Sequence, residues 1–150
     1  MIMKVLAVAS CGGHWEELYR IVKPLEDLFE ICYVSTRKDY ATLVEGKDFY
    51  TINDFNKNHC AKMLPAFFQA IQILLKVKPQ VVITTGAAPG LIMVFVAALL
   101  GKHTIWVDSM ANVQHLSLSG RLARHFVSRI YTQWPNLADK KVKYAGNVLG

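Results

Sequence analysis

The sequence is poor in cysteine, with Cys11, Cys32 and Cys60 as its three thiols. An odd number of cysteines without a Cys-x-x-Cys pair or a metal-binding Cys/His spacing argues against a disulfide framework and a zinc site. Free thiols are typical of a reducing cytosol. The fold must therefore rest on an ordinary hydrophobic core, for which 150 residues with 53% hydrophobic content suffice. We expect a single domain over residues 1–150.

The common nucleotide-binding loops are also missing. There is no GxxxxGK[ST], which argues against a nucleotide-hydrolysing P-loop, and no GxGxxG, the usual dinucleotide fingerprint. Six positions after Cys11 stands Glu17 rather than arginine, which does not suit a phosphatase loop with a cysteine nucleophile. The histidines show no metal-ligand spacing. We therefore expect no metal and no bound cofactor.

Acidic residues are scarce in the last third of the chain. Residues 101–150 contain seven Lys/Arg against two Asp/Glu, whereas residues 1–100 contain ten against nine. Most of the net charge of +6 therefore belongs to the C-terminal third. Such a field favours phosphates, nucleic acid or an anionic membrane surface as partners.

One uncharged run, Val81–Leu100, has the length of about twenty residues that a membrane-spanning helix needs. Two turn clusters, Thr84-Thr85-Gly86 and Pro89-Gly90, interrupt it at its centre. They predict a β-branched strand followed by a short apolar helix instead of one span. The N-terminus, with one basic residue before its apolar run, is unlike a signal peptide and predicts a buried strand.

Short apolar runs alternate with segments of helical periodicity along the chain. Strands that are apolar on both faces and separated by helices predict an α/β fold with a Rossmann-like parallel sheet covered by helices. The predicted strands are 4–9, 30–35, 49–52, 81–84 and 104–107, and the predicted helices are 15–25, 62–77 and 89–100, with a short helix possible within 37–48. Ligands of such sheets bind at the carboxyl ends of the strands. The loops to consider are therefore Ser10–His14, Thr85–Pro89 and Asp108–Ser117.

The first loop, Ser10-Cys11-Gly12-Gly13-His14, joins a strand to a helix. Glycines let a phosphate approach backbone N–H groups at a helix N-terminus, so the loop is a candidate anion site, although a tight turn without a ligand explains Gly12 and Gly13 equally well. His14 could accept a proton from a sugar hydroxyl near neutral pH. Its alternative role is a local hydrogen bond at the start of the helix.

The second loop, Thr85 to Pro89, offers hydroxyls, N–H groups and space for a ligand at the start of another helix. Alternatively, its glycine and proline serve only to form the turn before that helix.

Two helices are candidates for membrane contact. On a helix over Gly120–Ile130, four basic side chains share one face and apolar residues take the other, and Leu64–Val77 has lysines at its ends. An amphipathic helix that packs on the core has the same pattern.

Several segments together resemble one family. It is the oligosaccharide biosynthesis family that includes the membrane-anchoring subunit of the dolichol-linked N-acetylglucosamine transferase and its bacterial exopolysaccharide and capsule counterparts. The likeness extends over the whole chain to Tyr144-Ala145-Gly146. The segments that carry it are Ala9-Ser10-Cys11-Gly12-Gly13-His14, Thr85-Gly86-Ala87-Ala88-Pro89, Trp106 to Val113, Leu116 to Leu122 and Tyr131-Thr132-Gln133-Trp134-Pro135.

The resemblance implies the N-terminal, acceptor-side half of a GT-B glycosyltransferase split onto its own chain. A partner subunit would bind the nucleotide sugar, and together they would transfer a sugar with inversion, and without a metal on this subunit, to a lipid-pyrophosphate-linked saccharide. It also implies roles for site residues. His14 would be the base, the acceptor pyrophosphate would meet Ser10, Gly12, Gly13, Thr85 and Gly86, and Asp108, Ser109 and Asn112 would lie elsewhere in the cleft.

The chain departs from the family pattern at one loop. Where the family suggests Glu-Ser, an aromatic residue, Ala and Arg, this sequence has Asp108-Ser109-Met110-Ala111-Asn112, which keeps a carboxylate and loses a positive charge. The anchor helix of the eukaryotic members is not in this sequence, so we expect a cytoplasmic protein that is peripheral on the inner face of the membrane. No nucleic-acid partner is expected.

Two other functions remain open at this stage. The chain could be a noncatalytic scaffold that recruits a catalytic glycosyltransferase to the membrane. It could also be a free-standing Rossmann domain that binds a nucleotide or a flavin.

Overall fold

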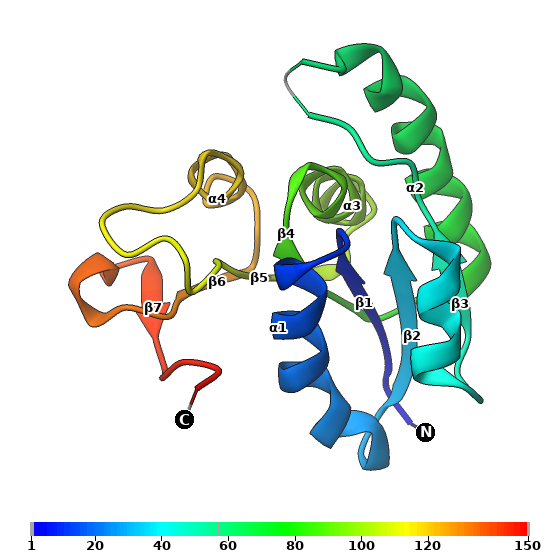
Figure 1. Ribbon diagram of the computed structural model, residues 1–150, viewed down its shortest axis with the longest axis horizontal. Coiled ribbons are helices and arrows are strands. Elements are labelled where there is room, and N and C mark those ends of the chain that lie inside the picture. Colours follow the sequence, from blue (N-terminus) through cyan, green and yellow to red (C-terminus); the bar gives the residue numbers. More distant parts are fainter. Residues whose placement is uncertain (1, 57, 150) are drawn as a thin grey trace.

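The computed structural model describes residues 2–56 and 58–149, and its central feature is one parallel sheet (Figure 1). The seven strands lie in the order β3-β2-β1-β4-β5-β6-β7, and every neighbouring pair is parallel. The strands are β1 (Lys4–Ala9), β2 (Glu30–Ser35), β3 (Phe49–Thr51), β4 (Val81–Gly86), β5 (His103–Val107), β6 (Arg129–Thr132) and β7 (Val142–Tyr144). The helices are α1 (Gly13–Val22), α2 (Met63–Val77), α3 (Ala88–Leu99) and α4 (Leu118–Ala123), with 3-10 helices η1 (Lys23–Asp27), η2 (Lys38–Val44), η3 (Cys60–Lys62) and η4 (Pro135–Leu137).

The predicted α/β fold with a Rossmann-like parallel sheet is confirmed. β1 and β2 have the predicted bounds, and in each strand all residues after the first are buried, as expected of strands covered on both faces. The uncharged run Val81–Leu100 divides into β4 and α3 at Ala87, as its glycine and proline residues predict.

The prediction for the region after Ser117 is wrong. We expected a helix over Gly120–Ile130, but α4 ends at Ala123 and β6 begins at Arg129. Thr104 and Ser128 explain the change, because the N–H group of each residue donates to the hydroxyl of the other. These bonds dock the chain beside β5, where it continues as a strand. The predicted basic helical face that includes Arg129 therefore does not exist.

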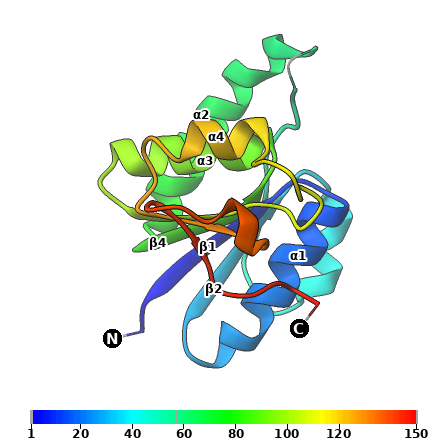
Figure 2. The same ribbon diagram turned by 90° about the vertical axis from the view of Figure 1, so that its left-hand side faces the viewer.

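Helices cover the two faces of the sheet unequally, as Figure 2 shows. Alternate residues of β1 separate the layers: Leu6 and Val8 pack in the core with α2, α3 and α4, whereas Val5, Ala7 and Ala9 pack with α1. The α1 layer holds Trp15, which is 2% exposed, stacks on Tyr19 and packs at tilted or edge-on angles against Tyr33, Tyr40 and Phe49. On this side the C-terminal segment, rather than a second long helix, follows β7.

The packing of α3 on the sheet can be tested at a close contact between α3 and β4. Gly90 is buried on α3, and a Cβ added there would meet the side-chain hydroxyl of Thr84. We expect Gly90→Ala to lower the free energy of unfolding by about 1–3 kcal/mol because it overpacks this contact. Denaturant unfolding would measure the change. In the control Gly13→Ala the new Cβ enters open space, and equal losses in both variants would contradict the packing.

Candidate functional site

The three loops singled out in the sequence meet at the carboxyl edge of the sheet. They enclose a pocket of about 210 Å³. The pocket includes five of the predicted site residues, namely His14, Thr85, Gly86, Ser109 and Asn112, and its other lining residues are Ala87, Trp106, Ala111, Ser117 and Ser119. Among these described lining residues there is no lysine or arginine. Any attraction for an anion must therefore come from backbone groups and helix ends.

The glycine loop turns the chain from β1 into α1. Gly12 is the N-cap with φ +84°, a left-handed conformation that favours glycine. Two of the amides expected to face a phosphate are already used: Cys11 N–H donates to the Thr36 hydroxyl at 3.1 Å and Gly12 N–H to the Tyr40 hydroxyl at 3.1 Å. Among the described residues, no side-chain hydrogen bond caps the N-terminus of α1. The amides of this loop that are left for an anion are therefore those of the first turn beginning at Gly13, and Gly12 supplies the turn.

His14 is held by the second loop. Its Nδ1 lies 2.9 Å from the carbonyl oxygen of Thr85, and the Thr85 hydroxyl donates back to the carbonyl of His14. Because a carbonyl can only accept, Nδ1 carries the proton and Nε2 of the neutral ring is left as a proton acceptor. Gly86 fits this contact, since a Cβ there would lie 3.3 Å from the imidazole ring and its φ is +107°.

The second loop also brings a second helix end to the pocket. α3 begins after Ala87, and no side chain caps it. Ser10 fastens this turn to the first loop, because its hydroxyl accepts from Ala87 N–H at 3.3 Å and its own N–H donates to Gly86. Ser10 and Thr85 therefore connect the two loops, while His14 of the first turn of α1 and Ala87, the N-cap of α3, line the same pocket.

Asp108, predicted as a cleft residue, lies behind the pocket lining. Its side chain is 2% exposed and does not line the pocket. The carboxylate accepts from the indole N–H of Trp106, from both the backbone N–H and the hydroxyl of Ser117, and from the side-chain amide of Asn112. These bonds fold residues 108–117 into a compact wall. Asp108 thus shapes the pocket from behind, and Asn112 keeps a donor beside this carboxylate although the expected arginine is missing.

Two residues at the site were not predicted from the sequence. Glu17, on α1, accepts from Ser109 Oγ at 2.8 Å, Met110 N–H at 2.9 Å and Gln133 Nε2 at 2.6 Å. Gln133 is 3% exposed and lies directly after β6. Ligands of such sheets bind at the carboxyl ends of the strands, so a correct prediction of β6 would have marked Gln133 as a candidate site residue. Glu17 follows His14 by three positions, which places both near one side of α1.

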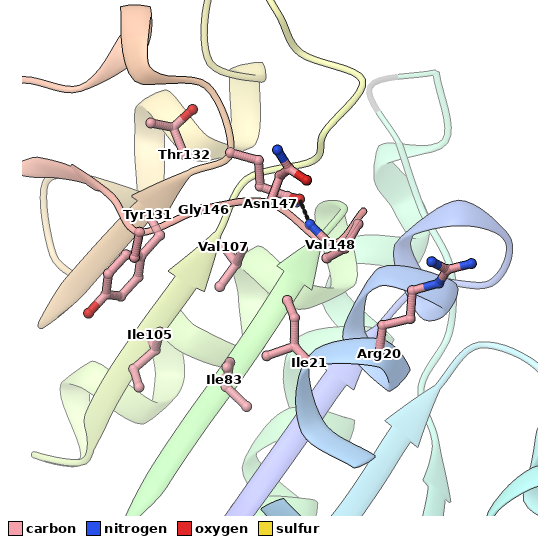
Figure 3. Close-up of a pocket in the computed structure, with 12 residues that line it drawn as sticks. Arg20, Ile21, Ile83, Ile105, Val107, Tyr131, Thr132, Gly146, Asn147 and Val148 are labelled. Atoms are coloured by element: carbon pink, nitrogen blue, oxygen red, sulfur yellow. Dashed lines mark hydrogen bonds between the residues drawn. The ribbon is translucent and has the colours of Figure 1, made fainter. Parts of the chain in front are cut away.

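A second, larger cavity of about 480 Å³ lies on the α1 side of the sheet (Figure 3). Its floor is formed by side chains of β4 and β5, Ile83, Ile105 and Val107, and one wall by Arg20 and Ile21 of α1. The C-terminal segment Ala145–Val148 lines the remaining side. Across residues 2–56 and 58–149, no three histidine, cysteine or acidic side chains gather as potential metal ligands.

A family described as "Oligosaccharide biosynthesis protein Alg14 like" matches residues 51–148, well over half of the sequence. The chain belongs to this family. The match confirms the resemblance noted in the sequence. One relative of this Alg14-like chain is the UDP-N-acetylglucosamine transferase subunit ALG14 of Yarrowia lipolytica, 28% identical over 95% of this chain and 80% of its own length. The mouse subunit of the same name is 24% identical over 98% and 83%.

Solved structures share the fold of the Alg14-like chain. MurG of Acinetobacter baumannii superposes with a TM-score of 0.82 at 17% identity, over 97% of this chain and 46% of MurG. UDP-GlcNAc 2-epimerase of Neisseria meningitidis, bound to UDP-GlcNAc, gives a TM-score of 0.75 at 15% identity over 98% and 47%. The Alg14-like chain thus spans about half the length of these proteins and has the fold of one half of a GT-B-like chain.

Asp108 provides a test of how the pocket wall is built. Asp108→Asn keeps the shape but turns an NH2 donor toward the donor groups of Trp106 or Ser117. We expect a loss of about 2 kcal/mol in the free energy of unfolding because a buried donor loses its partner. Urea unfolding monitored by tryptophan fluorescence would measure it. The exposed Asp54→Asn is the matched control, and unchanged stability of Asp108→Asn would refute this role of the carboxylate.

Proposed function

We propose that this chain is the acceptor-side subunit of a two-part GT-B glycosyltransferase. The enzyme moves N-acetylglucosamine from UDP-N-acetylglucosamine to a lipid-pyrophosphate-linked saccharide. Membership of the Alg14-like family and the names of the relatives support a transferase subunit. The match to 46% of MurG supports the division of one enzyme between two chains. The donor site then lies on the partner, and this chain contributes the acceptor wall.

The observation that carries the acceptor assignment is the convergence of two uncapped helix N-termini on one pocket. The first turn of α1 offers free N–H groups beginning at Gly13. In α3, by contrast, Pro89 has no N–H group and Ala87 N–H donates to Ser10, so α3 contributes mainly the positive end of its dipole. Such an end stabilises a phosphate without a charged side chain. Two ends at one pocket suit two linked phosphates, with Gly13 leaving the approach to α1 open.

His14 is positioned to act as the base. When an acceptor hydroxyl attacks the anomeric carbon of the donor sugar, its proton passes to Nε2 of His14. The new carbon–oxygen bond forms as the bond to the nucleotide diphosphate breaks, which inverts the anomeric centre. The Thr85 carbonyl at 2.9 Å from Nδ1 holds the required tautomer and stabilises the imidazolium that forms.

The larger cavity supports a partner on the α1 side of the sheet. Its floor of Ile83, Ile105 and Val107 is apolar, and in the described chain the C-terminal segment rather than a helix stands over it. Sheets of this type bury both faces. An apolar segment of the donor-binding subunit would complete this layer.

Helix α2 supports membrane attachment at the cytoplasmic face. Cys60–Val77 has the length and composition of a membrane span, with 28% of it buried. One face, which includes Ala66, Ala70 and Leu74, packs in the core. The other exposes Leu64, Phe68 and Leu75 by 61%, 55% and 59%. A helix with one packed and one exposed apolar face lies in the membrane interface rather than across it.

The position of α2 fits this role. In Figure 1 its N-terminal turns project beyond the sheet on the side to which the strand arrows point, which is the edge that carries the pocket. Lys62, Lys76 and Lys78 flank the apolar face and favour anionic lipids. The lipid tail of the acceptor could then stay in the membrane while its pyrophosphate reaches the pocket.

The role of His14 can be tested with the chain reconstituted with its donor-binding subunit. We expect His14→Ala to lower kcat about 10²–10⁴-fold, as loss of a general base does, with little change in the KM for UDP-N-acetylglucosamine. Transfer to a synthetic polyprenyl-pyrophosphate N-acetylglucosamine would be measured. The control His103→Ala alters an exposed histidine of β5.

Two results would contradict the proposal. Full turnover by the His14→Ala complex would favour a scaffold that only recruits the catalytic subunit. Transfer by this chain alone would contradict the division into two parts.

The membrane surface can be tested by vesicle binding. We expect the double variant Leu64→Ser and Phe68→Ser to bind phosphatidylglycerol vesicles at least about tenfold more weakly, because it removes exposed apolar area at α2. The matched control replaces Leu28 and Leu43, which are equally exposed but lie outside α2. Sedimentation with the vesicles would measure binding. Equal losses in both double variants would show that α2 is not the contact surface.

A further inference from the structure

The Glu17 carboxylate joins three segments that are far apart in the sequence. From α1 it accepts hydrogen bonds from Ser109 and Met110 of the loop after β5, and from Gln133 at the end of β6. Hydrogen bonds to a carboxylate are stronger than those between neutral groups. The hydrogen bonds of Glu17 are therefore the main connection between α1 and the cleft loop, which is defined as Asp108–Asn112.

Gln133 connects the same hydrogen-bond network to the C-terminal segment. Its amide nitrogen donates to Glu17 Oε1 at 2.6 Å and to the carbonyl of Asp108 at 3.0 Å. Its amide oxygen accepts from Val148 N–H at 3.0 Å, the bond drawn as a dashed line in Figure 3. The buried amide thus has a definite orientation, with donors toward the cleft loop and the acceptor toward the C-terminal segment.

The next residue strengthens the connection. The indole N–H of Trp134 donates to the Met110 carbonyl at 2.6 Å. Met110 is therefore held from both sides, by Glu17 at its N–H and by Trp134 at its C=O. Its neighbours Ser109, Ala111 and Asn112 line the candidate acceptor pocket, so movement of Met110 would alter the pocket wall.

We propose that Glu17 and Gln133 are positioning residues that link the C-terminal segment to the cleft loop. Contacts made by Ala145–Val148 at the larger cavity would then set the geometry of the acceptor pocket through Gln133, Glu17 and Met110. A partner that orders this segment would also order the pocket. The link rests on the hydrogen bonds alone, whereas its effect on acceptor binding rests on the proposed function.

Removal of a single N–H group tests the link in the isolated chain. Val148→Pro lacks the donor to Gln133, while the matched control Val148→Ala keeps it and loses the same side chain. We expect Val148→Pro to speed hydrogen exchange of Met110 N–H and Trp134 Nε1–H about tenfold relative to Leu6 N–H in β1, with Val148→Ala close to the wild type. Nitrogen-15 NMR would measure all three groups.

The ratio to Leu6 separates local opening from a general loss of stability. A ratio equal to that of the wild type in Val148→Pro would overturn the link, whether or not the whole chain is destabilised. An equal increase in Val148→Ala would overturn it too, since the backbone N–H would then not be the connection.

The effect on the pocket is tested in the reconstituted complex. We expect Glu17→Gln to raise the KM for the polyprenyl-pyrophosphate N-acetylglucosamine acceptor about tenfold and to leave the KM for UDP-N-acetylglucosamine unchanged. The control Glu16→Gln alters the adjacent exposed carboxylate. Equal changes in both KM values, or none, would overturn the positioning role. If the wild-type complex transfers no sugar, the proposed function fails while the exchange experiment still decides the link.

Discussion

A carboxylate buried at the end of β5 organises the candidate site. Asp108 is almost without solvent contact, and an ionised group there must be surrounded by donors. The donors come from Trp106 before it and from Asn112 and Ser117 after it, so the chain has to return on itself around the carboxylate. This return forms the pocket wall. It also requires glycine at position 120, where a Cβ would lie 2.5 Å from the carboxylate.

The sequence predicted the first five strands well and the last two not at all. β1 and β4 are runs of β-branched and small apolar residues between clear turn signals, so their type is decided locally. β6 has only four residues and begins with a basic one, and these residues also fit the apolar and basic faces of an amphipathic helix. Its structure is decided by pairing with β5 and by the Thr104–Ser128 bonds. Such bonds between distant residues have no local signal.

The candidate site shows the same division. Glycines and a histidine after β1 carry a recognisable pattern, and the parallel sheet then brings Thr85 and Ser109 to them. The functions of Glu17 and Gln133 depend on which groups they meet, and those partners are remote in sequence. A buried polar residue becomes informative only when its hydrogen bonds are known. The roles of His14 and the predicted phosphate donors stay predictions, now with a defined geometry.

The two cavities bear on the proposed division of a GT-B-like enzyme between two chains. The proposed acceptor pocket has no lysine or arginine among its described lining residues, so its polarity comes from the helix ends and the imidazole of His14. The larger cavity has an apolar floor, in which Ile83 and Val107 are 8% and 9% exposed beneath the C-terminal segment of the described chain. The segment beside that surface is hydrogen-bonded, through Gln133, to the wall of the pocket. If the partner docks at that surface, as we propose, the same few bonds would let it affect acceptor binding without touching the acceptor.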